Sequence, residues 1–197
     1  VFKKRKIKLF LERMRKIILL SSCIVFLALL STDLISQSEV STISNVSVSK
    51  YVAIQRSVNL TDGILFGNVT PGTNDNPASH NSDNNGNTSM WIDVSSDSNI
   101  NIDLCIKANA PLTRQGGTET IPLSGYTFAD NSTIDGANLV PASSYAISTS
   151  YQKTNQTNIS PGSKDYFRFW LDIPAGQAPG NYNNTIYFKG VETGTNC

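Results

Sequence analysis

The stretch of this chain that decides its fold is Lys164-Asp165-Tyr166-Phe167-Arg168-Phe169-Trp170-Leu171-Asp172-Ile173. Within it, apolar side chains occupy every second position from Phe167 to Ile173, and polar or amphipathic ones stand between them. Successive side chains of a β-strand point to opposite faces of the sheet. This period of two therefore indicates a strand that turns one face to a core.

The same alternation recurs elsewhere in the chain, and no segment after the first 38 residues keeps a helical period. Between positions 99 and 107, Ile102, Leu104 and Ile106 share one face with Ile100, and Asp103 lies on the other face. Further strands are expected at 64–66, 88–95, 125–129, 144–153 and 185–191.

Turn residues separate these runs. Pairs such as Pro71-Gly72 and Pro161-Gly162 supply fixed or positive φ angles. The segment 73–87 consists almost wholly of Asn, Asp, Ser, Gly and Thr, so we expect a solvent-exposed loop there. About seven short strands separated by turns predict an all-β fold, namely a single antiparallel β-sandwich of the immunoglobulin-like or jelly-roll type.

The longest alternating run is nearly uncharged and precedes the other strands. Its apolar residues stand at even positions, namely Val46, Val48, Val52, Ile54, Val58 and Leu60. It is either the first strand of its own sandwich or a donor strand that inserts into the open sheet edge of a neighbour. Donation would produce a head-to-tail contact of the kind that builds filaments. We therefore distinguish an N-terminal strand arm, 39–60, from a β-sandwich domain, 61–197.

The first 38 residues have the composition of an export signal. Eight Lys and Arg side chains lie within the first 16 positions, and an apolar run follows over 17–30. This order is typical of a secretory signal peptide. We expect residues 1–38 to be an N-terminal signal helix, with Met14 as an alternative start and cleavage before Glu39. The other interpretation is an uncleaved membrane anchor over 17–35. Either places the protein outside the cell, secreted or at the cell surface, with membrane contact only through this segment.

The formal net charge of +1 conceals two unlike parts. After Ser38 the chain carries 8 basic and 13 acidic residues, a net charge of −5, and its polarity comes mainly from Asn, Ser and Thr. A nucleic-acid-binding protein would need a clustered basic face. The composition therefore argues against a nucleic-acid partner.

Beyond the export signal the chain has two cysteines, Cys105 and Cys197. In an exported chain such a pair predicts a disulfide, the alternatives being free thiols or an intermolecular bond. Asn-x-Ser/Thr sequons begin at Asn45, Asn59, Asn68, Asn87, Asn131, Asn155, Asn158 and Asn183. They are acceptors in an organism that N-glycosylates secreted proteins.

The residues that could carry catalysis are few. His80 is the only histidine and lies in the polar 73–87 segment, so no nucleophilic relay or zinc site is indicated. Asp93 and Asp103 could serve glycoside hydrolysis only if they met in a cleft, and surface acids are the simpler interpretation. We expect no enzyme activity and no cofactor.

One weak calcium candidate remains. Asn81, Asp83 and Asn85 place oxygen-bearing side chains at alternate positions before Gly86, as in the opening of a Ca²⁺ loop. The twelfth position of that pattern requires Glu but holds Ile92. We therefore predict a polar loop and no metal site.

Two stretches resemble known families. Leu65-Phe66-Gly67-Asn68-Val69-Thr70-Pro71-Gly72 resembles the G-N-(L/V)-x-P-G turn of the TasA/camelysin-type secreted β-sandwich proteins. Those proteins, and similar archaeal bundling pili, are surface filament subunits joined by donor strands. The stretch from Ile173 to Thr185 is similar to the final hairpin of spore-coat-U-type secreted pilins, although their early cysteine pair is missing here.

The resemblance implies a role for turn residues and assigns no catalytic residue. It implies that Gly67, Pro71 and Gly72 shape one turn. A second turn would be shaped by Pro174, Gly176, Gly180 and Tyr182.

These observations together predict a non-enzymatic, secreted structural protein of the cell surface. It would be a filament or surface-layer-associated subunit that associates with its own copies by β-strand exchange. The alternative is a secreted carbohydrate-binding or adhesion module for surface glycans. In that case exposed Trp91, Trp170 or Tyr166 would serve as stacking platforms.

Overall fold

The computed structural model describes residues 10–19, 41–85, 88–133 and 139–197, and the chain divides into two compact units, 1–47 and 48–197. Residues 10–19 are helical and exposed. The remainder of the expected export signal, including the cleavage site before Glu39, lies outside the described residues. In the ranges given above, no helix combines the length and the hydrophobicity needed to cross a membrane.

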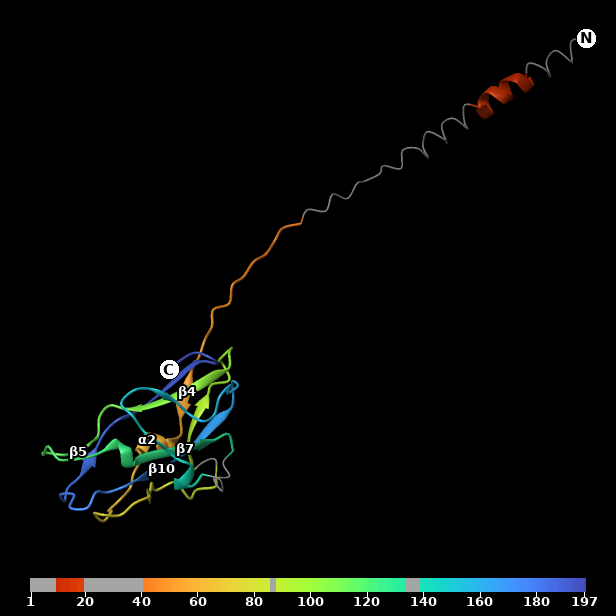
Figure 1. Ribbon diagram of the computed structural model, residues 1–197. Helices are drawn as coiled ribbons and strands as arrows, with labels where there is room; N and C mark the ends of the chain where they lie inside the picture. Colours follow the sequence, from red (N-terminus) through yellow and green to blue (C-terminus); the bar gives the residue numbers. More distant parts are fainter. Residues whose placement is uncertain (1–9, 20–40, 86–87, 134–138) are drawn as a thin grey trace, which may run out of the picture. The chain divides into compact units, whose positions relative to one another are not determined.

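The largest sheet has the strand order β1-β3-β10-β7-β8, and β2 pairs with one end of β10. Figure 1 labels two strands of this sheet, β7 and β10. Its strands are β1 (Ile54–Arg56), β2 (Asn76–Pro77), β3 (Met90–Val94), β7 (Tyr126–Asn131), β8 (Tyr145–Ala146) and β10 (Lys164–Leu171). The stretch quoted first thus forms the central strand, β10, which has neighbours along both edges.

Two three-stranded sheets complete the domain. The first, in the order β12-β4-β9, contains β4 (Ile102–Ala108), β9 (Gln152–Lys153) and β12 (Ile186–Glu192). The second, in the order β11-β5-β6, contains β5 (Leu112–Arg114), β6 (Thr120–Ile121) and β11 (Tyr182–Asn183). Every strand pairing described is antiparallel, which confirms the all-β antiparallel class. Closure into an immunoglobulin-like or jelly-roll sandwich stays a prediction.

One hydrophobic core draws side chains from all three sheets. Phe167 of β10 meets Phe188 of β12 edge to face, with ring centroids 5.2 Å apart. Leu104 and Ile106 of β4 are fully buried, as the alternation predicted. Cys105, on the other face of β4, is equally buried because the C-terminal residues cover it.

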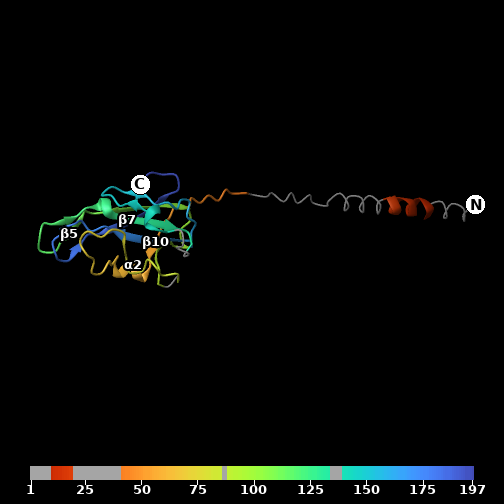
Figure 2. The same cartoon turned by 60° about the horizontal axis from the view of Figure 1, so that its bottom comes forward.

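The alternating run from Val46 to Leu60 does not form one strand, so that part of the prediction is wrong. Strand β1 has three residues, and helix α2 (Val58–Asp62) follows it at the margin of the domain in Figure 2. Ser57 ends the strand because its Oγ accepts a hydrogen bond from the Leu60 amide and caps the helix. Helical geometry then sends Val58 to solvent and Leu60 into the core.

Two other expectations need correction. Residues 64–66 form no strand, and the run 144–153 is divided between β8 and β9. Two 3-10 turns, η1 (Leu123–Gly125) and η3 (Pro141–Ser143), precede β7 and β8 respectively.

Candidate assembly interface

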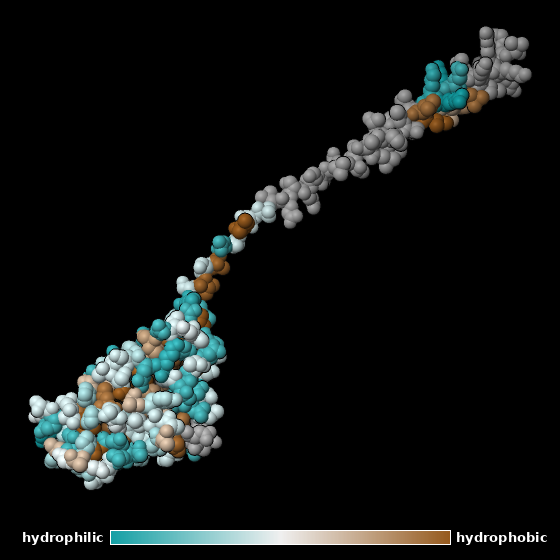
Figure 3. All heavy atoms as spheres, viewed as in Figure 1, coloured by the Kyte–Doolittle hydropathy of each residue, from teal (hydrophilic) through white to brown (hydrophobic). Residues whose placement is uncertain are grey.

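The segment that precedes β1 carries exposed apolar side chains. Residues 41–51 contain no helix or strand, and Ile43, Val46 and Val48 are 94%, 83% and 78% exposed. Figure 3 shows hydrophobic residues at intervals along it, between hydrophilic ones. We call residues 41–51 the arm. It carries no charge before Lys50, and Ile43, Val46 and Val48 stand in it between Ser, Thr and Asn side chains.

The predicted donor residues separate into two groups. Val46 and Val48 lie in the exposed arm, but Val52 and Ile54 pack against the core of their own domain. A Cβ atom placed on Gly190 of β12 would lie 3.2 Å from Val52, which shows how closely this segment crosses the sheet. Only the part before Tyr51 is therefore available for donation.

The arm is tethered where it meets the domain. The backbone oxygen of Ser49 accepts a hydrogen bond from Asn99 Nδ2 at 2.9 Å, and the Tyr51 amide donates to Asn99 Oδ1 at 2.8 Å. Lys50 Nζ lies 2.6 Å from a carboxylate oxygen of Glu192, the last residue of β12. These contacts fix the root of the arm beside the end of β12.

The two stretches that resemble secreted filament proteins lie side by side and line one groove of about 790 Å³. One wall is formed by 63–71 and the other by 177–184. The side chains between the walls are apolar or aromatic, namely Leu112, Ile121, Tyr126, Leu171 and Ile173. No lining residue is charged.

Turn geometry holds the two walls of the groove. Gly67 and Gly72 have φ angles of 67° and 81°, a left-handed conformation that favours glycine. The Gly72 amide donates to the Ile173 oxygen at 2.8 Å and joins the walls at one end. In the other wall, the Tyr182 hydroxyl donates to the Ala178 oxygen at 2.8 Å and locks the hairpin.

The arm root and the groove lie at opposite ends of strands β4 and β12. Ile102 pairs with Glu192 at the arm-root end, and Ala108 pairs with Ile186 at the other end. The groove begins just beyond Ala108, at Leu112. Seven strand residues span roughly 20 Å at about 3.3 Å each.

The predicted cysteine pair is confirmed, because the Sγ atoms of Cys105 and Cys197 are 2.09 Å apart. The bond attaches the last residue of the chain to the middle of β4. Lys189 Nζ donates to the Cys197 oxygen at 2.7 Å beside it.

Buried acids form a feature that sequence reasoning missed. Asp165 is fully buried, and neither of its carboxyl oxygens has a hydrogen-bond partner within the described ranges. Burial, together with the nearby charge of Asp130, raises the pKa of Asp165 to about 9. Asp130 is also buried, and its carboxyl group accepts backbone hydrogen bonds from Asn155 and Gln156 at 3.0 and 2.8 Å. The one sequence signal for the burial of Asp165 was the alternation, because it places Asp165 on the same strand face as Phe167.

The pair that could have served hydrolysis is not brought together. Asp93 lies on β3 of the largest sheet, and Asp103 lies on β4 of another. Asp103 accepts hydrogen bonds from Lys153 Nζ at 2.7 Å and from the amides of Asn158 and Gly194 at 2.9 and 3.1 Å. Burial alone would raise the pKa of Asp103, but these donors outweigh it and lower the pKa.

The calcium-candidate residues have structural partners. The side-chain amide of Asn81 donates to the Phe169 oxygen at 2.6 Å and accepts from the Phe169 amide at 2.9 Å, as a strand partner would. Asp83 Oδ2 lies 2.8 Å from His80 Nδ1, and the Asp83 backbone oxygen accepts from the buried Arg168 at 2.6 Å. The expectation of a solvent-exposed loop is thus only partly right for 73–85, since this stretch contains β2 and the buried Ala78, and Asn85 also takes part in an interaction.

The sequons differ in accessibility. Five of them have an exposed asparagine, namely Asn45, Asn68, Asn155, Asn158 and Asn183. Asn59 and Asn131 are half-buried, and the Asn59 amide donates to the Thr88 oxygen. Asn87 lies outside the described residues.

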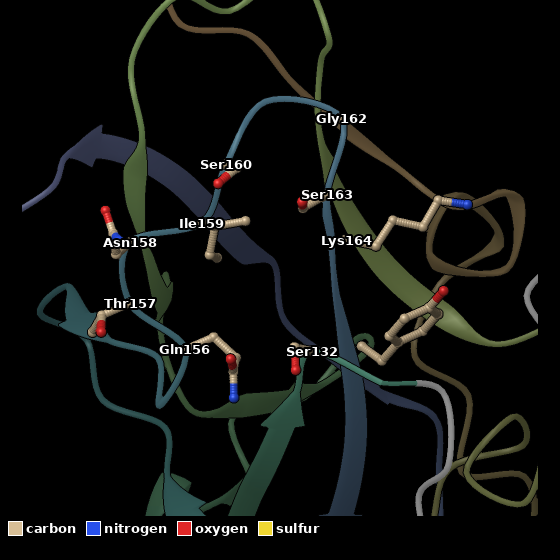
Figure 4. Close-up of a pocket in the computed structure, with 10 residues that line it drawn as sticks. Ser132, Gln156, Thr157, Asn158, Ile159, Ser160, Gly162, Ser163 and Lys164 are labelled. Carbon is tan, nitrogen blue, oxygen red and sulfur yellow. The ribbon is translucent and has the colours of Figure 1, made fainter.

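The predicted aromatic platforms are only partly available. Trp170 is 5% exposed, so it is a buried residue, and Lys164 Nζ lies 4.0 Å from the centre of the half-buried Trp91 ring. Tyr166 lines a polar pocket of about 460 Å³. Figure 4 shows Gln156, Ser160 and other short polar side chains around the opening of this pocket.

The groove was not predictable as a site, because its apolar floor residues come from strands that are distant from one another in the chain. The available signal was the lack of charge in the two stretches that resemble filament proteins. No protein family model matches this chain, and no curated protein matches it either.

Proposed function

We propose that this protein is a non-enzymatic, exported structural subunit of the cell surface that assembles with its own copies by donating the arm. The observation that carries the proposal is the exposure of Ile43, Val46 and Val48 in an uncharged segment without helix or strand. Such side chains gain free energy when a partner removes them from water, at roughly 25 cal/mol for each Å² buried.

The sheets offer edges to which an added strand could bind. Strand β12 pairs only with β4 among the described strands, and β1 pairs only with β3. Main-chain groups at a free strand edge bind an extended segment through ladder hydrogen bonds. Because donor and acceptor would lie on different copies, the contact is head-to-tail and can continue into a filament.

The proposal is tested with the exported protein and charged arm variants. Val46→Asp combined with Val48→Asp should leave single subunits in sedimentation velocity and no filaments in electron microscopy, because two charges would have to be buried. Ser47→Asp, on the opposite side of the alternation, is the matched control and should still assemble. Assembly by the double variant, or wild-type protein that stays monomeric at every concentration, would refute the proposal.

A second candidate function, saccharide binding, is favoured by the polar pocket beside Tyr166. Hydroxyl and amide side chains around an aromatic ring suit the hydroxyl groups and the apolar faces of a sugar. In a glycan array, Tyr166→Ala should abolish selective binding and Tyr187→Ala on β12 should not. An array without selectivity for any glycan would exclude this function.

A further inference from the structure

We infer that the acceptor of the donated arm is the groove between 63–71 and 177–184, and that its occupant is the arm of a second copy of this chain. This inference rests on the proposed function and names the partner surface. The groove is mainly apolar and has a volume of about 790 Å³. It falls in the range of volumes that ordinarily hold a bound segment or ligand.

The groove and the arm match in charge. Neither the groove lining nor residues 41–49 contain a charged side chain, although charged residues are spread over the rest of the domain. In natural proteins, charged side chains on an exposed strand edge discourage that edge from pairing with another chain. The groove and the arm both lack these charged side chains, so neither would oppose the binding of the arm in the groove.

The groove has an exposed apolar wall and a buried floor. Leu65 on one wall is 54% exposed, and the wall segment around it belongs to no strand. Below it, Phe66 packs edge to face on Tyr126, with ring centroids 5.4 Å apart. An incoming Val46 or Val48 would therefore meet the apolar side chains of the wall and of the floor.

Chain length shows that the occupant comes from another copy. Ser49 is held beside Asn99, so Val46, three residues before it, can reach only about 11 Å from that point. The groove lies roughly 20 Å away, at the other end of β4. Val46 cannot enter the groove of its own domain, whereas the groove of a copy stacked end to end is free to receive it.

The free edge of β12 fits the arm less well. It carries Lys189 and Glu192, and Glu192 already pairs with Lys50 at the arm root. A strand added there would bring its uncharged residues against charged ones. The β12 edge is the alternative acceptor, and the cross-linking experiment below distinguishes it from the groove.

The assignment is tested by mixing variants of the exported protein that each carry one introduced cysteine in addition to the Cys105–Cys197 disulfide. Val46→Cys in one preparation and Leu65→Cys in the other should give a disulfide-linked heterodimer on a non-reducing gel only when the two are mixed. Val46→Cys mixed with Tyr187→Cys, which marks β12, should give none. Cross-linking to Tyr187→Cys in place of Leu65→Cys would overturn the groove as acceptor and leave arm donation standing.

A charge placed in the groove provides a second measurement. Leu65→Lys should weaken assembly about tenfold or more in sedimentation velocity, because an unpaired charge in an apolar site is costly. Tyr187→Lys is the exposed control and should assemble as the wild type does. Assembly unchanged by Leu65→Lys would overturn the inference, whereas wild-type protein without any assembly would overturn the proposed function itself.

Discussion

At the scale of single residues, Asp165 is the most unusual side chain in the domain. It stands on the core-facing side of β10, where alternation would place an apolar residue, and its carboxyl group has no described hydrogen-bond partner. A carboxyl group in this position is held in its neutral form, since burial raises its pKa to about 9.

This raised pKa predicts how stability depends on pH. The unfolded chain loses the Asp165 proton near its ordinary pKa of 3.8, whereas the folded protein keeps it until about pH 9. The folded state thus binds one more proton between these values, so the free energy of unfolding should fall as pH rises through that window, by up to about 1.4 kcal/mol per pH unit.

Asp165→Asn should remove this dependence on pH. The variant should therefore gain more unfolding free energy over the wild type at pH 8 than at pH 5. Urea unfolding at the two pH values measures the effect. Asp97→Asn, at an exposed position, is the control and should follow the wild-type slope. An Asp165→Asn variant with that same slope would contradict the assignment.

At the scale of elements, a single hydroxyl group ends the alternating run. Ser57 Oγ accepts the Leu60 amide at 3.2 Å and the Trp91 amide at 3.2 Å, and the Ser57 amide donates to the Trp91 oxygen at 2.9 Å. One residue thereby caps helix α2 and attaches it to β3. The element after β1 becomes a helix in spite of a pattern that favours a strand.

Ser57→Ala should therefore cost about 0.5–2 kcal/mol of unfolding free energy, the usual effect of removing a helix N-cap. Thermal or urea denaturation followed by circular dichroism measures it. Val58→Ala, at an exposed position of the same helix, keeps the cap and serves as the control. A Ser57→Ala variant as stable as this control would show that the cap contributes nothing.

The loop over β10 presents a second element-scale case. Asn81 takes the place of a strand partner for Phe169, and Arg168 is covered by the same loop. Asn81→Ala would leave the Phe169 amide unpaired, while the Phe169 oxygen keeps the Ala78 amide as a donor, and one unpaired buried group costs about 1–3 kcal/mol. Ser82→Ala, exposed in the same loop, is the control, and equal denaturation midpoints for the two variants would contradict this role.

At the scale of the whole molecule, one disulfide joins chain positions 92 residues apart. Cross-linking so long a loop restricts the unfolded chain, and by the chain-entropy relation it contributes about 4.6 kcal/mol. Cys105→Ala combined with Cys197→Ala should lower the melting temperature by several degrees. Calorimetry with and without reductant measures this, and a wild-type melting curve unchanged by reductant would contradict it.

The whole molecule also decides what the arm can do. Ile43, Val46 and Val48 are exposed, whereas Val52 and Ile54 pack against the core. The division depends on Asn99 and Glu192, which hold the root. Neither residue has any local sequence relation to the arm.

Much of the fold was predictable because alternation is a local property. The core-facing sets on β4 and β10, the positive φ angles at Gly67 and Gly72, and the cysteine pair all follow from short stretches of sequence or from composition. What failed was also local in origin. Ser57 caps a helix inside an apparently continuous strand, and Trp170 is buried although it stands opposite the core-facing residues.

The sequence alone determined that the chain folds as antiparallel sheets with a cysteine pair, because period, turn residues and composition act over a few residues at a time. Only the tertiary structure decided that 63–71 and 177–184 face each other across a groove. The tertiary structure also decided that Asp165 is buried beside Asp130, and that the arm root and the groove lie at opposite ends of β4. These features join residues that are distant in the chain, and pairing and packing of whole strands set them.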